Sequence, residues 1–179
     1  MSDIDDFSRT VFEQAKRFLE KAKVGEEDIV GANLHAALLL GFCAFEGHLN
    51  SLADELALRP GLSAHELSIL RELEVNLKKG KFINSKNLKM YRLDDRIEFI
   101  FQKFANVQIS STEAWWGNLK VGISLRNQLV HPKVDMSLKV SDVERALQAI
   151  LDCLNNLYWA VFNKKYPRVN LGLASKLSF

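Results

Sequence analysis

The segment that decides the fold is Leu34–Leu56, with the sequence LHAALLLGFCAFEGHLNSLADEL. Its apolar residues recur at steps of three and four, which is the period of an α-helix. Since Pro60 cannot continue a helical hydrogen-bond ladder, the sequence predicts one helix over residues 28–58. This helix is the most apolar of the chain, so we expect it to lie at the centre of a bundle. The predicted core positions are Leu34, Leu38, Phe42, Phe45, Leu49, Leu52 and Leu56.

The helical period continues on both sides of this segment, in a chain that has only three prolines and nine glycines. Ser63 with Glu66, and Ser141 with Glu144, have the spacing of a capping box, which marks the start of a helix. The other predicted helices span residues 3–23, 63–77, 93–105, about 112–131, and 141–162. Residues 78–89 lack periodicity and are predicted to form a loop.

These patterns predict the fold class all-α, an up-and-down bundle of five to six helices. The length of 179 residues is ordinary for one domain. We expect a single domain over residues 1–165. Residues 166–179 would then be a C-terminal tail that docks on the domain or on a partner.

Composition excludes several classes of protein. The two cysteines, Cys43 and Cys153, lack the spacing of a metal site, and we expect both to be buried in a reducing compartment. The N-terminus is acidic and polar, unlike a signal peptide, and the longest apolar run, residues 36–45, is about half a membrane span. We therefore expect a cytoplasmic protein without a membrane segment, a metal or a cofactor.

The net charge of +2 does not by itself predict a nucleic-acid partner, but the cations are unevenly placed. No acid lies between Val75 and Leu93, and the tail after Phe162 is also basic and free of acids. The first zone could follow a phosphate backbone or could be a solvated loop. Its cations are Lys78, Lys79, Lys81, Lys86, Lys89 and Arg92, and those of the tail are Lys164, Lys165, Arg168 and Lys176.

The candidate for chemistry is LRNQLVHPK, Leu125–Lys133, at the end of the fifth predicted helix. Asn127 and His131 are four residues apart, about 40° in helical projection, whereas Arg126 lies about 140° from His131. One copy therefore does not bring Arg126 and His131 together, but two copies facing each other across a two-fold axis could. Pro132 ends the helix at this point.

This motif resembles the signature of the HEPN superfamily (higher eukaryotes and prokaryotes nucleotide-binding domain), which consists of arginine, a polar residue, a few spacers and histidine. RNQLVH, Arg126–His131, fits the form with four residues between arginine and histidine. The long early helix with AFEGHLN at Ala44–Asn50, and one further helix after the motif, are also similar to that family.

The resemblance implies a homodimer and a metal-independent endoribonuclease of a toxin–antitoxin or antiviral defence system, with a possible antitoxin or defence protein as partner. In that reading His131 moves a proton, Arg126 holds the phosphate, Asn127 orients one of them, and Glu46 positions Arg126. Cleavage would proceed by attack of the ribose 2′-hydroxyl. The candidate RNA-binding residues are Lys78, Lys79, Lys81, Lys86, Lys89 and Lys133.

Plainer interpretations of the same residues stay open. His131 could bond free carbonyls at a helix end, with Arg126 paired to a carboxylate such as Glu46. Trp115 and Trp116 could stack on bases, or could belong to the core and a subunit interface. The alternative function is a non-catalytic helical module that binds a protein, a nucleotide or a nucleic acid.

Overall fold

The computed structural model describes residues 3–167 and 169–177. Within these ranges the chain forms six α-helices, one two-stranded sheet and two short helical turns. The helices are α1 (Asp3–Val24), α2 (Glu27–Leu56), α3 (Ala64–Arg71), α4 (Leu93–Ile100), α5 (Ala114–Val130) and α6 (Val140–Phe162). The strands are β1 (Leu73–Lys78) and β2 (Lys81–Leu88), and the short turns are η1 (Phe101–Ala105) and η2 (Val169–Leu171). The chain is therefore mostly helical, as the apolar period predicts.

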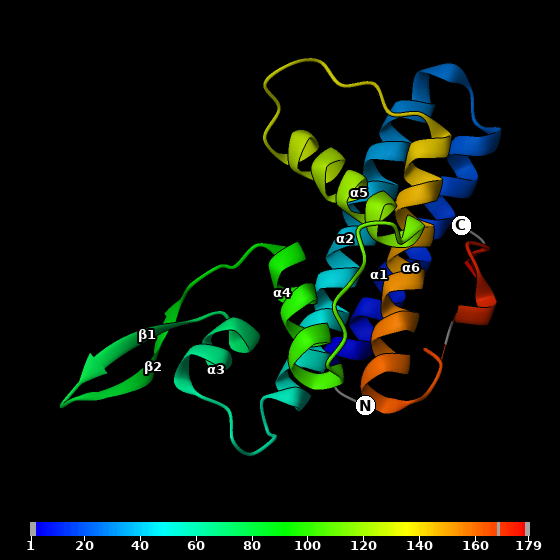
Figure 1. Ribbon diagram of the computed structural model, residues 1–179. Coiled ribbons are helices and arrows are strands. Elements are labelled where there is room, and N and C mark those ends of the chain that lie inside the picture. The colour runs from blue at the N-terminus through cyan, green and yellow to red at the C-terminus, as the bar shows by residue number, and fades with distance from the viewer. Residues whose placement is uncertain (1–2, 168, 178–179) are drawn as a thin grey trace.

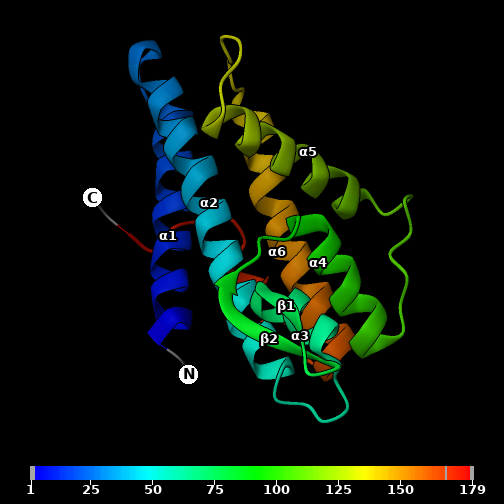
Figure 2. The same cartoon turned by 90° about the vertical axis from the view of Figure 1, so that its left-hand side faces the viewer.

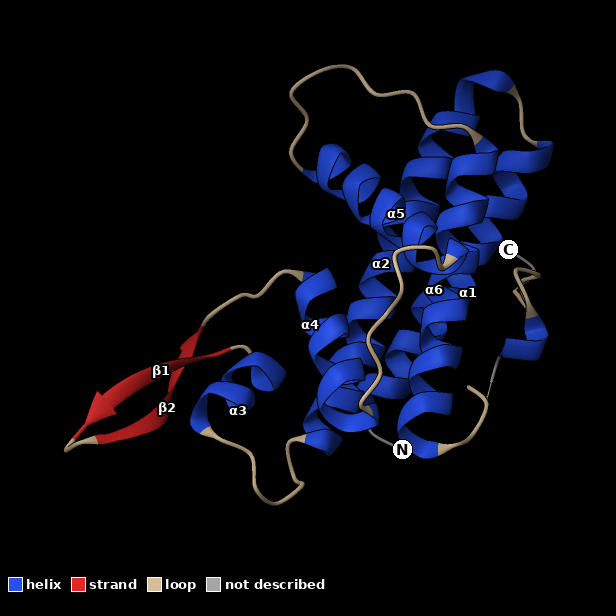
Figure 3. Ribbon diagram, viewed as in Figure 1, coloured by secondary structure: helices blue, strands red, loops and turns tan. Residues whose placement is uncertain are grey.

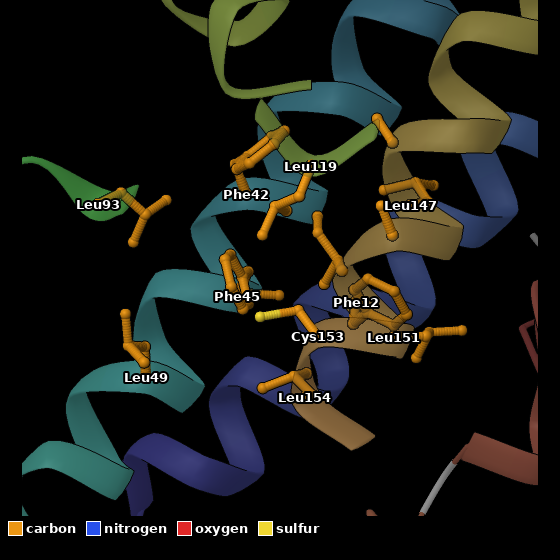
Figure 4. Close-up of a cluster of buried hydrophobic side chains, with 14 of the residues drawn as sticks. Phe12, Phe42, Phe45, Leu49, Leu93, Leu119, Leu147, Leu151, Cys153 and Leu154 are labelled. Carbon is orange, nitrogen blue, oxygen red and sulfur yellow. The ribbon is translucent and has the colours of Figure 1, made fainter. Parts of the chain in front are cut away.

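The long helices α1, α2 and α6 lie side by side, and α4 and α5 pack beside them (Figures 1 and 2). All seven apolar residues predicted for the core of α2 are buried. They meet side chains from α1, α5 and α6, as Figure 4 illustrates with Phe42, Leu119 and Leu147. Within the described residues, Ile29–Leu56 is the one helix long and apolar enough to cross a membrane. Its packing explains this composition, because α2 is the core helix of the bundle.

The segment after α3 differs from the prediction, because it forms a β-hairpin where a helix to Leu77 and a loop over residues 78–89 were expected (Figure 3). Helix α3 ends at Arg71, and Glu72 takes the left-handed conformation with φ 51°. The strands are antiparallel and are joined by Lys79 and Gly80, with φ 49° and 74°. Two consecutive positive φ values define the tight turn whose twist matches a hairpin.

The N-termini of α3 and α6 test the two capping boxes that the sequence predicts. Ser63 and Glu66 form the predicted capping box, with the Ser63 backbone N–H donating to the Glu66 carboxylate at 2.7 Å. The box predicted for Ser141 and Glu144 is wrong, because the N-cap of α6 is Lys139, two residues before Ser141. There the Lys139 backbone N–H donates to the Asp142 carboxylate at 3.3 Å.

The C-terminal segment folds back on the bundle over its described part. The Ser175 and Lys176 backbone N–H groups donate to the carboxylates of Glu20 and Glu13 on α1, at 2.7 and 2.9 Å. Tyr166 is buried, and its hydroxyl lies 3.2 Å from Nε2 of His48. Arg168 of the predicted basic tail lies outside the described residues.

The expectation that both cysteines are buried is wrong for one of them. Cys153 of α6 is fully buried in the core, and burial raises the pKa of its thiol. Cys43 of α2 is exposed. Cys43 follows Phe42 of the predicted core stripe and lies about 100° from it around the helix, so the helical period itself places Cys43 away from the core.

Candidate functional site

The motif occupies the C-terminal half of α5, and that half is the exposed one. The buried residues of α5, Trp116, Leu119 and Gly122, all precede it. Asn127 and His131 are exposed and Arg126 is half-buried. His131 ends the helix with φ −126° and ψ 65°, and its backbone N–H donates to the Asn127 carbonyl at 2.9 Å. Since Pro132 follows, the histidine side chain is presented from a fixed helix end.

Arg126 is held from two directions by side chains of α2. Its Nη2 lies 2.5 Å from the Glu46 carboxylate, and its guanidinium lies 5.6 Å from the centre of the Phe42 ring. Nε of Arg126 is buried and has no hydrogen-bond partner among the residues that the structure describes. The guanidinium keeps donors that are not used by Glu46, so it can still bind an anion.

Glu46 is part of a larger pattern on α2, where Glu46, Asn50 and Asp54 are spaced by four and share a face. Each binds an arginine from a different helix. Asn50 accepts from Nη1 of Arg96 on α4 at 3.0 Å, and Asp54 lies 3.9 Å from Nε of Arg71 on α3. Arg126 of α5 is the third of these arginines and binds Glu46. The three residues of α2 therefore tie the surrounding helices α3, α4 and α5 to α2.

Of the three arginines, Arg96 is the buried one, and its contacts anchor the first turn of α4. Its guanidinium donates to the carbonyls of Ile69 and Leu70, at 3.2 and 2.9 Å, and pairs with Glu72 at 3.1 Å. Burial lowers its pKa, and Glu72 acts in the opposite direction. These bonds tie the first turn of α4 to the end of α3. Glu72 also accepts from the Tyr91 backbone N–H of the β2–α4 linker, at 3.3 Å.

Two adjoining hollows, here together called the motif groove, lie between that linker and α5. The larger has a volume of about 570 Å³ and is lined by His131, Lys120 and Lys133 among others. The smaller, about 310 Å³, is lined by Arg126 with Glu46. Asn127, Arg92, Asp94 and Ile123 line both hollows. Arg126 and His131 therefore face different parts of one groove, as their helical projection predicts, and Asn127 lies between them.

Arg92 lies where the two hollows meet. It donates two hydrogen bonds to Asp94, from Nη2 at 2.6 Å and from Nε at 3.1 Å. These bonds raise the pKa of its guanidinium. Arg92 belongs to the basic zone predicted from the sequence, but its place beside the motif was not predicted.

Lys120 was missed entirely, although the sequence carries a signal for it. Lys120, Ser124, Asn127 and His131 recur at steps of four, three and four, so they form one polar stripe on α5. All four line the larger hollow. Extending the motif backwards by the helical period would have found Lys120.

The predicted RNA-binding lysines separate into two groups. Lys133 lines the motif groove. Lys78, Lys79, Lys81 and Lys86 lie on the hairpin, and Lys89 lies on the linker that leads from β2 to the groove. None of these six lysines forms a salt bridge within the part of the chain that the structure describes.

The tryptophans pack inward rather than into the groove. Trp116 is buried, and the Trp115 ring lies 5.7 Å from the Trp116 ring and 6.0 Å from the Phe101 ring. Their placement supports α5 and offers no stacking platform beside His131. For both tryptophans, the sequence had left open whether they stack on bases or belong to the core and a subunit interface.

The donor set of the site suits proton transfer and anion binding. An exposed imidazole, a guanidinium and several ammonium groups surround the groove, with carboxylates paired to arginines. No group of three His, Cys, Asp or Glu side chains in residues 3–167 and 169–177 could hold a metal ion. Comparison of the chain with protein-family models, curated proteins and solved structures gives no match, so its function is argued from the site alone.

Proposed function

We propose that the chain is a metal-independent endoribonuclease of the HEPN type, acting as a cytoplasmic homodimer in a toxin–antitoxin or antiviral defence system. The observation that carries the proposal is the division of the motif along one groove. His131 faces the larger hollow, Arg126 faces the smaller, and Asn127 lines both. A second copy placed against this exposed half of α5 would add its own histidine and arginine, which gives a complete set of groups for phosphodiester cleavage.

The chemistry requires one base and one acid. His131 of one copy accepts the proton of the ribose 2′-hydroxyl as its oxygen forms a bond to phosphorus. The bond from phosphorus to the 5′-oxygen breaks, and the second copy's histidine donates the proton that this oxygen needs. The products are a 2′,3′-cyclic phosphate and a 5′-hydroxyl end.

Arg126 would offset the charge that builds on the phosphoryl oxygens. Its contact with Glu46 leaves the other guanidinium donors for the phosphate, and the Phe42 ring limits where the group can move. Glu46 thus acts as a positioning residue for Arg126. Asn127, between the two hollows, is placed to hold the scissile phosphate or the imidazole.

The decisive experiment compares two alanine variants of the same groove. Purified wild-type protein should cut single-stranded RNA in the presence of a chelator and leave cyclic phosphate ends. His131→Ala should lower the rate by roughly 10²–10⁴-fold, the usual contribution of a general acid or base. Gln128→Ala is the matched control, because Gln128 is exposed, lies on α5 and lines the same hollow but is outside the proposed chemistry.

Equal rates for wild type and His131→Ala would disprove the mechanism. Sedimentation of both variants checks the dimer. A growth defect on expression that disappears with His131→Ala would place the activity in a toxic or defensive role.

The second candidate is a non-catalytic module with the same fold, and one contact favours it. The 2.5 Å pair with Glu46 neutralises the motif arginine before any substrate arrives. A module of this kind would bind RNA, nucleotide or protein in the groove without cleaving it. Absence of cutting on diverse RNAs, together with unaffected growth on expression, would favour the module over the nuclease.

A further inference from the structure

The hairpin of β1 and β2 carries a cluster of cations at its tip. Lys78 and Lys81 are directly opposite each other in the strand register, and Lys79 is in the turn between them. All three side chains are exposed. Like charges directly opposite each other destabilise a hairpin. The tip therefore holds an unfavourable charge arrangement that a bound anion would relieve.

The two faces of the hairpin have different surroundings. On one face, Asn84 donates to the Ala64 carbonyl of α3 at 2.9 Å, and the Phe82 ring lies 4.9 Å from the His65 ring. Successive side chains of a strand point to opposite faces. Lys81 and its partner Lys78 consequently lie on the face that α3 does not cover, and Figure 1 shows the hairpin extending away from the bundle.

The cations continue from the tip to the motif groove along one strand. β2 runs from Lys81 past Lys86, and Lys89 follows its end, with its ammonium 5.0 Å from the Tyr91 ring. Tyr91 and Arg92 already line the groove. Eight strand residues span about 26 Å at the usual rise. The hairpin is thus long compared with a single nucleotide, and the linker after β2 connects it directly to the candidate site.

We propose that this hairpin is an arm that holds the phosphate backbone of an RNA strand outside the cleavage site and leads it into the motif groove. The inference rests on the proposed nuclease function and names how the substrate is held. Cations are present at the tip, along β2 and on the linker whose Tyr91 and Arg92 line the groove, which suits a polyanion longer than one nucleotide.

The test measures binding of a long uridine oligomer, with a chelator present, over a range of salt concentrations. The variant is Lys78→Gln with Lys81→Gln, and relief of the like-charge pair should leave its fold at least as stable as wild type. The matched control is Lys164→Gln with Lys165→Gln, which removes the same charge from two exposed lysines that follow α6.

Losing two phosphate contacts should lower the slope of log K against log salt by about 1.4, since single strands contribute about 0.7 per contact. Affinity at physiological salt should fall roughly tenfold. The control variant should match wild type in both quantities. An unchanged slope and affinity in the hairpin variant would overturn the inference.

Two further outcomes separate this proposal from others. If wild type cleaves no RNA but the hairpin variant still loses affinity and slope, the arm is supported and the nuclease function fails. If the hairpin lysines are needed for binding to anionic phospholipid vesicles but not to RNA, the arm is a membrane contact and the proposal is wrong.

Discussion

Two glycines of α5 allow a direct test of how the motif helix is seated. Gly122 lies against α2 and α6, and a Cβ added there would meet the Ala146 Cβ at 2.9 Å and the Phe42 Cζ at 3.1 Å. Gly117 lies earlier in the same helix, and an added Cβ would meet no atom of the described residues within 4 Å. Alanine at the two positions therefore makes the same chemical change in crowded and open surroundings.

The expected effects have opposite sign. Gly117→Ala should stabilise the protein by up to about 1 kcal/mol, the helix-propensity difference between the residues. Gly122→Ala receives the same gain, but overpacking costs about 1–3 kcal/mol. Its net effect is a loss of about 0–2 kcal/mol, so the variants should differ by about 1–3 kcal/mol. Phe42 also contacts the Arg126 guanidinium, so Gly122→Ala should disturb the motif as well.

Urea unfolding of the two variants and wild type supplies the measurement, with unchanged m-values as the check that the same transition is compared. Equal stabilisation by both alanines would show that α5 does not approach α2 and α6 as closely as described. In that case Arg126 of α5 would also not lie close enough to α2 to contact Glu46.

Two further predictions concern protonation and thiol reactivity. Hydrogen bonds from Lys103 and Ser63 lower the pKa of Glu66 from 4.5 to about 2, so its ionised form stabilises the fold above about pH 4.5, and this contribution is lost as pH falls toward 2. Glu66→Gln keeps an oxygen for the Ser63 N–H but loses the charge, so it should cost up to about 1 kcal/mol in urea unfolding at neutral pH and less near pH 2; an equal cost at both would refute this. A thiol reagent should modify Cys43 in the folded protein and Cys153 only after unfolding, and rapid modification of both without denaturant would contradict the buried position of Cys153.

The helical part of the fold could be predicted because long amphipathic segments repeat their signal many times. The expected span of residues 28–58 compares with Glu27–Leu56 in the structure, and that of residues 3–23 with Asp3–Val24. Glu46, Asn50 and Asp54 are spaced by four in the sequence, which places them on one face of a helix, and three arginines bind there. The pair of Arg126 with Glu46 was among the predictions and is confirmed. The partners of Arg96 and Arg71 depend on tertiary packing and could not be predicted.

The hairpin was missed because its strands are short and half-exposed, so the lysines obscured the alternation of Leu73, Val75 and Leu77. Gly80 in the sequence KKGK was the available signal, since a glycine in a two-residue loop accepts positive φ. For the site, the motif and its helix end followed from the sequence. The groove did not, because it depends on where the β2–α4 linker, with Arg92, lies against α5.

The uneven burial of α5 has a consequence for how the helix opens. Local unfolding requires little free energy where few apolar contacts are lost. The first half of α5 is anchored by Trp116, Leu119 and Gly122, whereas Asn127 to His131 has no buried residue. Amide exchange should therefore accelerate from one end of α5 to the other, with the last turn fraying first. A surface that covers this turn would slow its exchange most, so the motif half of α5 is where association would leave its clearest dynamic signature.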